Sequence, residues 1–168
     1  LGSAAQYPRH HLAQAVAVAR QLGDKETLAR CLFSHLFGSI FLWDAEENRA
    51  TAAELVQLAD ELGDKELVAR GLFSQIALGC ITGDFQTANA DIERFATLAH
   101  ELRLPQNLWY LGTLRAMQAM VAGRMEEAEQ LALQAFEVGR GPDPANSMIM
   151  YTAQTAAIRR EQGRAQEI

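Results

Sequence analysis

An internal repeat constrains this chain more than any other feature of its sequence. Residues 22–37 read LGDKETLARCLFSHLF and residues 62–77 read LGDKELVARGLFSQIA, so that ten of the sixteen positions are identical. Weaker copies continue along the chain at the same offset of 40 residues, which also separates Gly83, Gly123 and Gly163. A fixed period of roughly 20–50 residues is typical of proteins that stack one structural unit on the next. The chain therefore contains about four copies of one unit.

Each unit is predicted to form two α-helices. Gly23–Asp24 and Gly63–Asp64 mark the joint between them, because glycine suits the left-handed turn after one helix and aspartate caps the start of the next. Pro105 stands just after the equivalent joint of the third unit, at a first helical position that proline tolerates. From these joints and the second set of glycines we predict helices over residues 8–22, 25–42, 46–62, 65–82, 85–102, 105–122, 125–139 and 145–162.

Stacked helical hairpins are the fold that this pattern favours. The joints are short, so successive helices pack antiparallel. Apolar residues recur at helical spacing, and small residues such as Ala88, Ala116 and Ala128 would let helices approach closely. One hairpin cannot bury both of its faces, whereas stacked neighbours bury them in a continuous core. We therefore predict an all-α chain of about eight antiparallel helices.

The composition sets limits on location and partners. The net charge is −6, and the only basic cluster is that of Arg159, Arg160 and Arg164, so we expect no direct binding of nucleic acid. No apolar run is long enough to cross a bilayer and no signal peptide is visible, so no membrane partner is expected. Cys31 and Cys80 stand alone in apolar stretches, which is typical of a reducing compartment. We expect a cytoplasmic protein.

The joints and small residues resemble those of tetratricopeptide repeats. Residues 123–128 (GRMEEA) are similar to that family's turn between helices, and Ala135 falls where a second small residue is expected. Residues 109–112 (WYLG) have the family's residue types at a different spacing, and the period is 40 rather than about 34. The resemblance implies a right-handed α-α superhelix, in a longer-helix variety, that binds proteins or peptides on its concave side.

Three stretches also resemble the C-terminal helical arrays of large bacterial regulatory ATPases. They are residues 63–67 (GDKEL), 104–117 (LPQNLWYLGTLRAM) and 159–164 (RREQGR). Such proteins join a nucleotide-binding switch to a LuxR-type DNA-binding domain or to a nucleotidyl cyclase. The resemblance implies that residues 1–168 form a single repeat domain from a larger bacterial protein of transcription regulation or signalling. It carries over no catalytic residue.

No motif of an active site or metal centre is present. The patterns GxxxxGK[ST], HExxH, CxxC and GxSxG do not occur. The adjacent His10 and His11 would point about 100° apart on a helix, and no third ligand stands near them. The acidic pairs Asp60–Glu61 and Glu126–Glu127 lie on predicted outward faces, where their pKa values would stay ordinary. We predict that the chain is not an enzyme and needs no cofactor or metal.

The candidate binding residues lie on the first helix of each unit, which faces the concave side in tetratricopeptide arrays. Aromatic, methionine and arginine side chains there would suit a groove that anchors an amphipathic helix or an extended peptide. Alternatively, the phenylalanines and Met117 are core residues between stacked hairpins. The mapped positions are Arg30, Phe33 and Phe37, then Arg70, Phe73 and Ala77, then Tyr110, Thr113 and Met117, and last Met150, Ala153 and Arg160.

Two functions are compatible with this sequence. The first is a protein-interaction and regulatory module that docks a partner protein, or another domain of its own parent chain, in the groove. The second is a sensor that holds an apolar small molecule between helices near Phe33, Phe73 and Met117. The sequence does not distinguish a monomer from a dimer.

Overall fold

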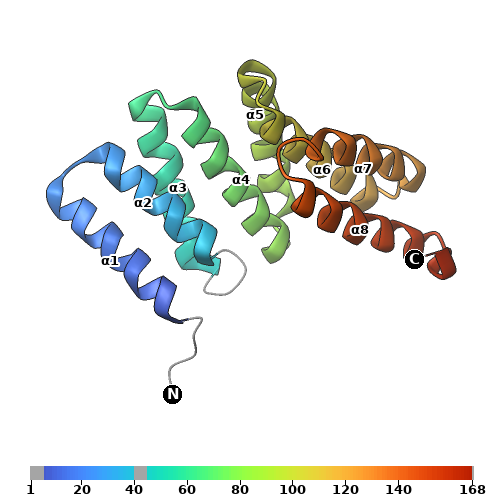
Figure 1. Ribbon diagram of the computed structural model, residues 1–168, viewed down its shortest axis with the longest axis horizontal. Helices are drawn as coiled ribbons and strands as arrows, with labels where there is room; N and C mark the ends of the chain where they lie inside the picture. Colours follow the sequence, from blue (N-terminus) through green and yellow to red (C-terminus); the bar gives the residue numbers. More distant parts are fainter. Residues whose placement is uncertain (1–5, 40–44, 168) are drawn as a thin grey trace. The chain divides into compact units, whose positions relative to one another are not determined.

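The computed structural model describes residues 6–39 and 45–167, and all regular structure in these residues is helical. Figure 1 shows the helices following one another from the N-terminus to the C-terminus. They are α1 (Gln6–Leu22), α2 (Lys25–Ser39), α3 (Ala45–Leu62), α4 (Lys65–Thr82), α5 (Phe85–Leu102), α6 (Pro105–Val121), α7 (Met125–Gly139) and α8 (Pro144–Glu161), followed by the 3-10 helix η1 (Ala165–Glu167).

The helices form two compact units. Unit 1 comprises Leu1–Leu98 and unit 2 comprises Ala99–Ile168, so that α5 begins in one unit and ends in the other. In unit 1, α1 packs against α2, α2 against α3 and α3 against α4, and α2 also contacts α4. In unit 2, α6 packs against α7 and α7 against α8, while α6 also contacts α8. The prediction of successive packed helices is confirmed within each unit, and the superhelix stays a prediction.

The joints have the backbone that the sequence predicts. Gly83 has a φ of 80° after the end of α4, and the N–H of Asp84 donates to the carbonyl of Gly79. Positive φ is open to glycine at little cost, and Gly123 and Gly163 take it at the same point of the two following repeats. The side chain of Asp64 caps α4 by accepting from the N–H of Leu67 at 3.0 Å. A non-glycine residue, Arg103, takes the left-handed turn before α6.

The helix boundaries follow from these joints. The predicted helices 65–82, 85–102 and 125–139 have the bounds of α4, α5 and α7. The predicted starts at residues 8, 46 and 145 and the ends at 122 and 162 differ by one or two residues. The end predicted at residue 42 lies outside the described residues.

Charged residues on the second helix of each repeat (α1, α3 and α5) distinguish one hairpin from the next. Arg20 of α1 pairs with Glu54 of α3, and Asp60 of α3 pairs with Arg94 of α5. The two pairs occupy equivalent positions in successive repeats, with their signs reversed. Each exposed pair adds little stability. A slip by one repeat would, however, place Arg20 beside Arg94, so the reversal favours the native order of hairpins.

Small residues let the helices of unit 2 approach closely. Ala116 and Ala119 of α6 lie in one buried cluster with Ala128 and Ala132 of α7, as the sequence predicts for Ala116 and Ala128.

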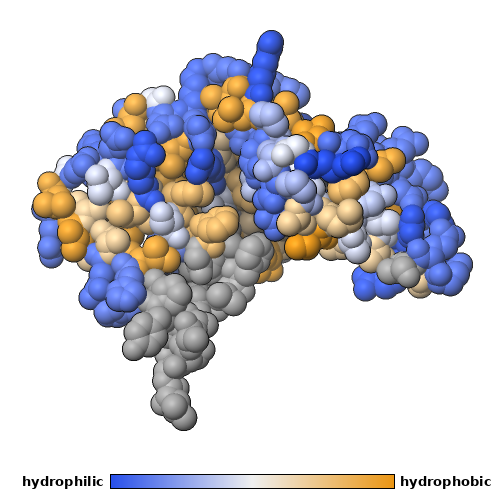
Figure 2. All heavy atoms as spheres, viewed as in Figure 1, coloured by the Kyte–Doolittle hydropathy of each residue, from blue (hydrophilic) through white to orange (hydrophobic). Residues whose placement is uncertain are grey.

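Exposed large hydrophobic side chains are scattered over the surface. On the face drawn in Figure 2, hydrophobic residues (orange) lie among hydrophilic ones (blue).

Candidate binding groove

A groove between α2 and α4 in unit 1 contains three of the predicted binding residues. Arg30 and Phe33 line it from α2, and Arg70 lines it from α4. Its volume is about 360 Å³, and the remaining lining residues are Ser34, Asp64, Glu66 and Leu67. The sequence predicted these three residues from their helical positions, and the structure brings them together.

Both arginines of the groove are held along their own helices. Arg70 pairs with Glu66 one turn earlier, and Arg30 pairs with Glu26 at 3.0 Å in the equivalent position of the preceding repeat. Such i, i+4 pairs restrict a long side chain without burying its charge. The guanidinium groups therefore stay at the surface in a repeated arrangement.

An aromatic surface lies between these arginines. The guanidinium carbon of Arg70 is 5.0 Å from the centre of the Phe33 ring, which is a cation–π distance. The ring of Phe33 is 6.2 Å from that of Phe37, whose side chain is 77% exposed. This surface offers apolar area and guanidinium donors side by side. It can hold an apolar side chain of a ligand while hydrogen-bonding a neighbouring carbonyl or carboxylate.

Phe73 lies outside this groove. Its ring centre is 6.3 Å from that of Phe95, a side chain of α5 that is fully buried. Phe73 itself is half-buried, as is Ala77 one turn later on α4. The alternative that some predicted groove residues belong to the core therefore fits Phe73, whereas Phe33 contacts the groove.

The predicted residues of unit 2 do not line this groove. Thr113 is buried, and its hydroxyl donates to the carbonyl of Trp109 at 3.1 Å. A threonine that bonds to the carbonyl one turn earlier needs no solvent, which makes burial possible. The Tyr110 ring stacks on Trp109 with centres 4.7 Å apart. The others are Met117, which is half-buried, and Met150, Ala153 and Arg160, which are exposed.

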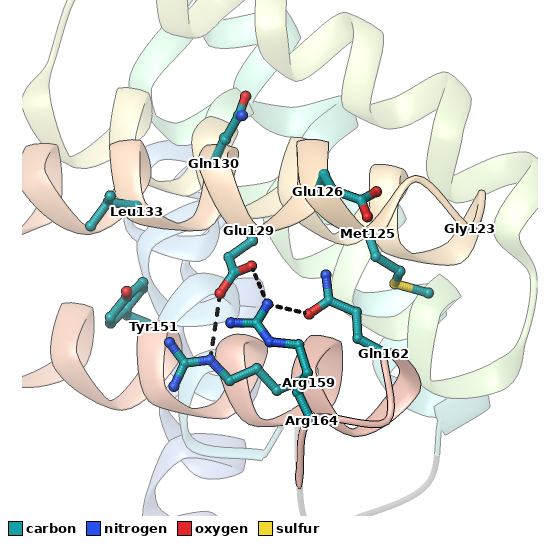
Figure 3. A pocket seen from close by; sticks show the side chains of 10 residues that line it. All are labelled: Gly123, Met125, Glu126, Glu129, Gln130, Leu133, Tyr151, Arg159, Gln162 and Arg164. Carbon is teal, nitrogen blue, oxygen red and sulfur yellow. Dashed lines mark hydrogen bonds and ion pairs between the residues drawn. The ribbon is translucent and has the colours of Figure 1, made fainter. Parts of the chain in front are cut away.

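A second groove, between α7 and α8, was not predicted. It measures about 820 Å³ and has Leu133 and Tyr151 toward one end. Figure 3 shows Arg159 and Arg164 pointing to Glu129 in its centre. Glu129 accepts from the Nε of Arg159 at 3.4 Å and from Nη1 of Arg164 at 3.1 Å. Only first helices were predicted to bind, so α7 was not a candidate. The other lining residues are Gly123, Met125, Glu126, Gln130 and Gln162.

The charged side chains of the second groove form ion pairs at the joint after α8. Arg164 also binds Glu167, and these hydrogen bonds hold the pKa of the Glu167 carboxyl below its usual value. Glu129 and Arg164 are equivalent to Arg49 and Asp84, which pair two repeats earlier with opposite signs. An ion pair that recurs at the same joint with its charges exchanged has a structural explanation. This makes the second groove the weaker candidate for a binding site.

Two further kinds of feature bear on function in the part of the chain that the structure covers, namely clusters of metal-ligating side chains and helices that could cross a membrane. Among those residues no group of three or more His, Cys, Asp or Glu side chains could hold a metal ion. None of the described helices combines the length and apolar character needed to cross a bilayer.

No protein-family model and no curated protein matches the chain. The groove between α2 and α4 is therefore the candidate site, because it combines exposed aromatic and arginine side chains.

Proposed function

We propose that this chain is a non-catalytic protein-interaction module that docks a segment of a partner protein in the groove between α2 and α4. The observation that carries the proposal is the position of Arg70 over the ring of Phe33, with both side chains lining the groove. Arginine and aromatic residues dominate the binding energy of protein interfaces. Here they stand on two neighbouring helices, where one segment can contact both.

The chemistry of the groove favours a particular kind of segment. An apolar side chain would lie against Phe33 and Phe37, while Arg30 and Arg70 would donate to carbonyl or carboxylate groups on either side. The acidic neighbours Asp64 and Glu66 would repel a strongly acidic segment. We therefore expect an amphipathic helix or extended peptide with one apolar anchor and few negative charges.

Charge reversal at Arg70 tests this proposal. Peptides selected from a displayed random library for binding to the chain should bind the Arg70→Glu variant about 30-fold more weakly, as is usual when a central arginine is lost. Fluorescence anisotropy of labelled peptides measures the change. Far-UV circular dichroism should show unchanged helix content, since Arg70 is exposed.

Arg140 provides a matched control. It pairs with Glu137 on α7 and lies 5.7 Å from the ring centre of Phe136, so it copies the local chemistry of Arg70 away from the groove. Arg140→Glu should leave peptide affinity unchanged. Equal loss in both variants would mean that binding reflects net charge alone. Selected peptides that bind Arg70→Glu as tightly as the natural chain would rule out the groove.

The sequence resemblance supports a regulatory context for this module. We propose that it is the helical-repeat part of a bacterial transcriptional regulator or signalling ATPase, in which the docked segment comes from the same chain or from a partner. Antibody capture of the natural gene product followed by intact mass spectrometry should then give a mass several times 18.5 kDa. ATP binding by the captured protein is also expected. A mass near 18.5 kDa would contradict this context and leave a free-standing adaptor.

A further inference from the structure

Each arginine of the groove between α2 and α4 belongs to an Arg–Glu pair that the repeat copies. Nε and Nη2 of Arg30 both donate to Oε1 of Glu26, at 3.2 and 3.0 Å. Nη2 of Arg70 donates to Oε1 of Glu66 in the same way. All four side chains are at least 46% exposed. A guanidinium has further N–H donors and a carboxylate has further lone pairs, so each pair offers both donors and acceptors to a ligand.

This arrangement discriminates among the polar groups that a ligand can bring. A carboxylate or phosphate would accept from Arg70 but would lie beside the carboxylate of Glu66, and like charges repel. An ammonium group would pair with Glu66 but would lie beside the guanidinium of Arg70. A carboxamide suits both members of the pair, because its oxygen accepts from the guanidinium while its NH2 group donates to the carboxylate. The groove therefore favours asparagine or glutamine side chains over charged ones.

The repetition of the pair sets the distance between two such carboxamides. Arg30 and Arg70 stand at the same repeat position on α2 and α4, which contact each other. Packed helices lie about 8–10 Å apart. A polyproline II helix completes each turn in three residues, over about 9 Å, so residues i and i+3 project from the same side at a matching distance. A β-strand returns to the same side after about 7 Å and again after about 13 Å, which matches less well.

The aromatic surface of the groove suits the same conformation. The rings of Phe33 and Phe37 are neighbours on α2, with centres 6.2 Å apart, and Arg70 lies over Phe33. Proline-rich segments dock on aromatic grooves because their polyproline II conformation is formed before binding, so little entropy is lost. A residue between the two carboxamides projects from another edge of the polyproline II helix, where it can lie against these rings.

We propose that the groove binds a proline-rich partner segment in the polyproline II conformation, with glutamine or asparagine at positions i and i+3 and an apolar residue between them. One carboxamide bridges Arg30 and Glu26, and the other bridges Arg70 and Glu66. This inference rests on the proposed function, because it specifies the segment that the module would dock.

Fluorescence anisotropy with three labelled octapeptides, acetylated and amidated at their ends, tests the proposal. The first is proline-rich, with glutamine at its third and sixth positions and leucine at its fifth. The second has glutamate in place of both glutamines, and the third exchanges the residues at the fifth and sixth positions. The first should bind about tenfold more tightly than either of the others, because each of them loses charge-assisted hydrogen bonds. Equal affinity for the first and second peptides would overturn the choice of carboxamides, and equal affinity for the first and third would overturn the polyproline II spacing.

Glu66→Ala separates a carboxamide site from a simple anion site. The variant should bind the glutamine peptide about fivefold more weakly, because the NH2 group of the ligand loses its acceptor. It should bind the glutamate peptide more tightly, since a repelling charge is gone. Tighter binding of the glutamine peptide would overturn the proposal.

Glu137→Ala is the matched control. Glu137 pairs with Arg140 on α7, away from the groove, so this variant should leave the affinity of both peptides unchanged. Circular dichroism should show that both variants keep their helices, since Glu66 and Glu137 are exposed. A loss for Glu137→Ala equal to that for Glu66→Ala would mean that net charge rather than the pair decides, and would also overturn the proposal.

The library-selected peptides separate this inference from the proposed function. If they lose affinity for Arg70→Glu while the glutamine octapeptide binds no better than its counterparts, the inference is wrong and the proposed function stands. If they bind Arg70→Glu as tightly as the natural chain, the docking groove and this inference both fail.

Discussion

Replacement of Trp109 by alanine is expected to lower the free energy of unfolding by about 3–5 kcal/mol. This is a large share of the roughly 5–15 kcal/mol that stabilises an ordinary domain. Trp109 is the largest buried side chain of α6, and its indole fills the space beside Gly139. Gly139 has no side chain that could move into the cavity that the indole would leave.

Urea denaturation followed by far-UV circular dichroism measures this loss. Tyr110→Ala is the comparison, because Tyr110 stacks on Trp109 but is only half-buried. We expect less than half of the loss for that variant, since its ring leaves a surface hollow rather than a closed cavity. A loss below about 1 kcal/mol for Trp109→Ala would show that the indole does not organise unit 2.

Most of the helical fold could be predicted from the sequence because each joint has its own local chemistry. A glycine that permits positive φ and a capping side chain act within a few residues, so their effect does not depend on distant contacts. Gly63 and Asp64 illustrate this: the glycine has a φ of 69°, and the aspartate caps α4 as predicted. Because the sequence repeats, the helix boundaries found at one joint also apply at the next.

The pairing between helices could not be predicted in the same way. Arg20 and Glu54 are 34 residues apart, and nothing in their local sequence distinguishes them from other exposed charges. A signal did exist, because Asp60 and Arg94 stand at the same repeat positions with the signs exchanged. Reading it requires the offset between contacting helices, which depends on how the hairpins stack.

The candidate groove was partly visible in the sequence. Arg30 and Arg70 stand out because the repeat preserves them together with the glutamate one turn earlier. The contact of Arg70 with Phe33 joins two different repeats, so no spacing within one helix reveals it. Thr113 was mapped from its helical position alone, and such a mapping does not reveal the hydrogen bond inside its own helix that permits its burial.

Compensating changes in side-chain size at two positions of the repeat lead to the second prediction of a large effect on stability. Position 109 holds tryptophan where the repeat has Ala29 and Ala69, and position 139 holds glycine where the repeat has Ala59. Trp109 and Gly139 are in contact, so the larger residue on α6 is matched by a smaller one on α7. The pair should therefore tolerate change in both residues better than change in Gly139 alone.

Gly139→Ala is expected to lower the free energy of unfolding by about 1–3 kcal/mol, the usual cost of overpacking. The added Cβ would be 2.6 Å from the Cβ of Ser147 and 2.7 Å from the indole of Trp109. The sign is informative, because alanine otherwise favours a helix over glycine by up to about 1 kcal/mol. With Trp109→Ala already present, the same substitution should cost at least about 1 kcal/mol less, since the indole is gone.

A double-mutant cycle in urea measures this coupling directly. Gly141→Ala serves as the control, because a Cβ there would approach only the Val138 carbonyl, at an ordinary 3.9 Å. That variant should change stability little in either background. If the effects of Trp109→Ala and Gly139→Ala simply add, within about 0.5 kcal/mol, then the two residues do not compensate for each other.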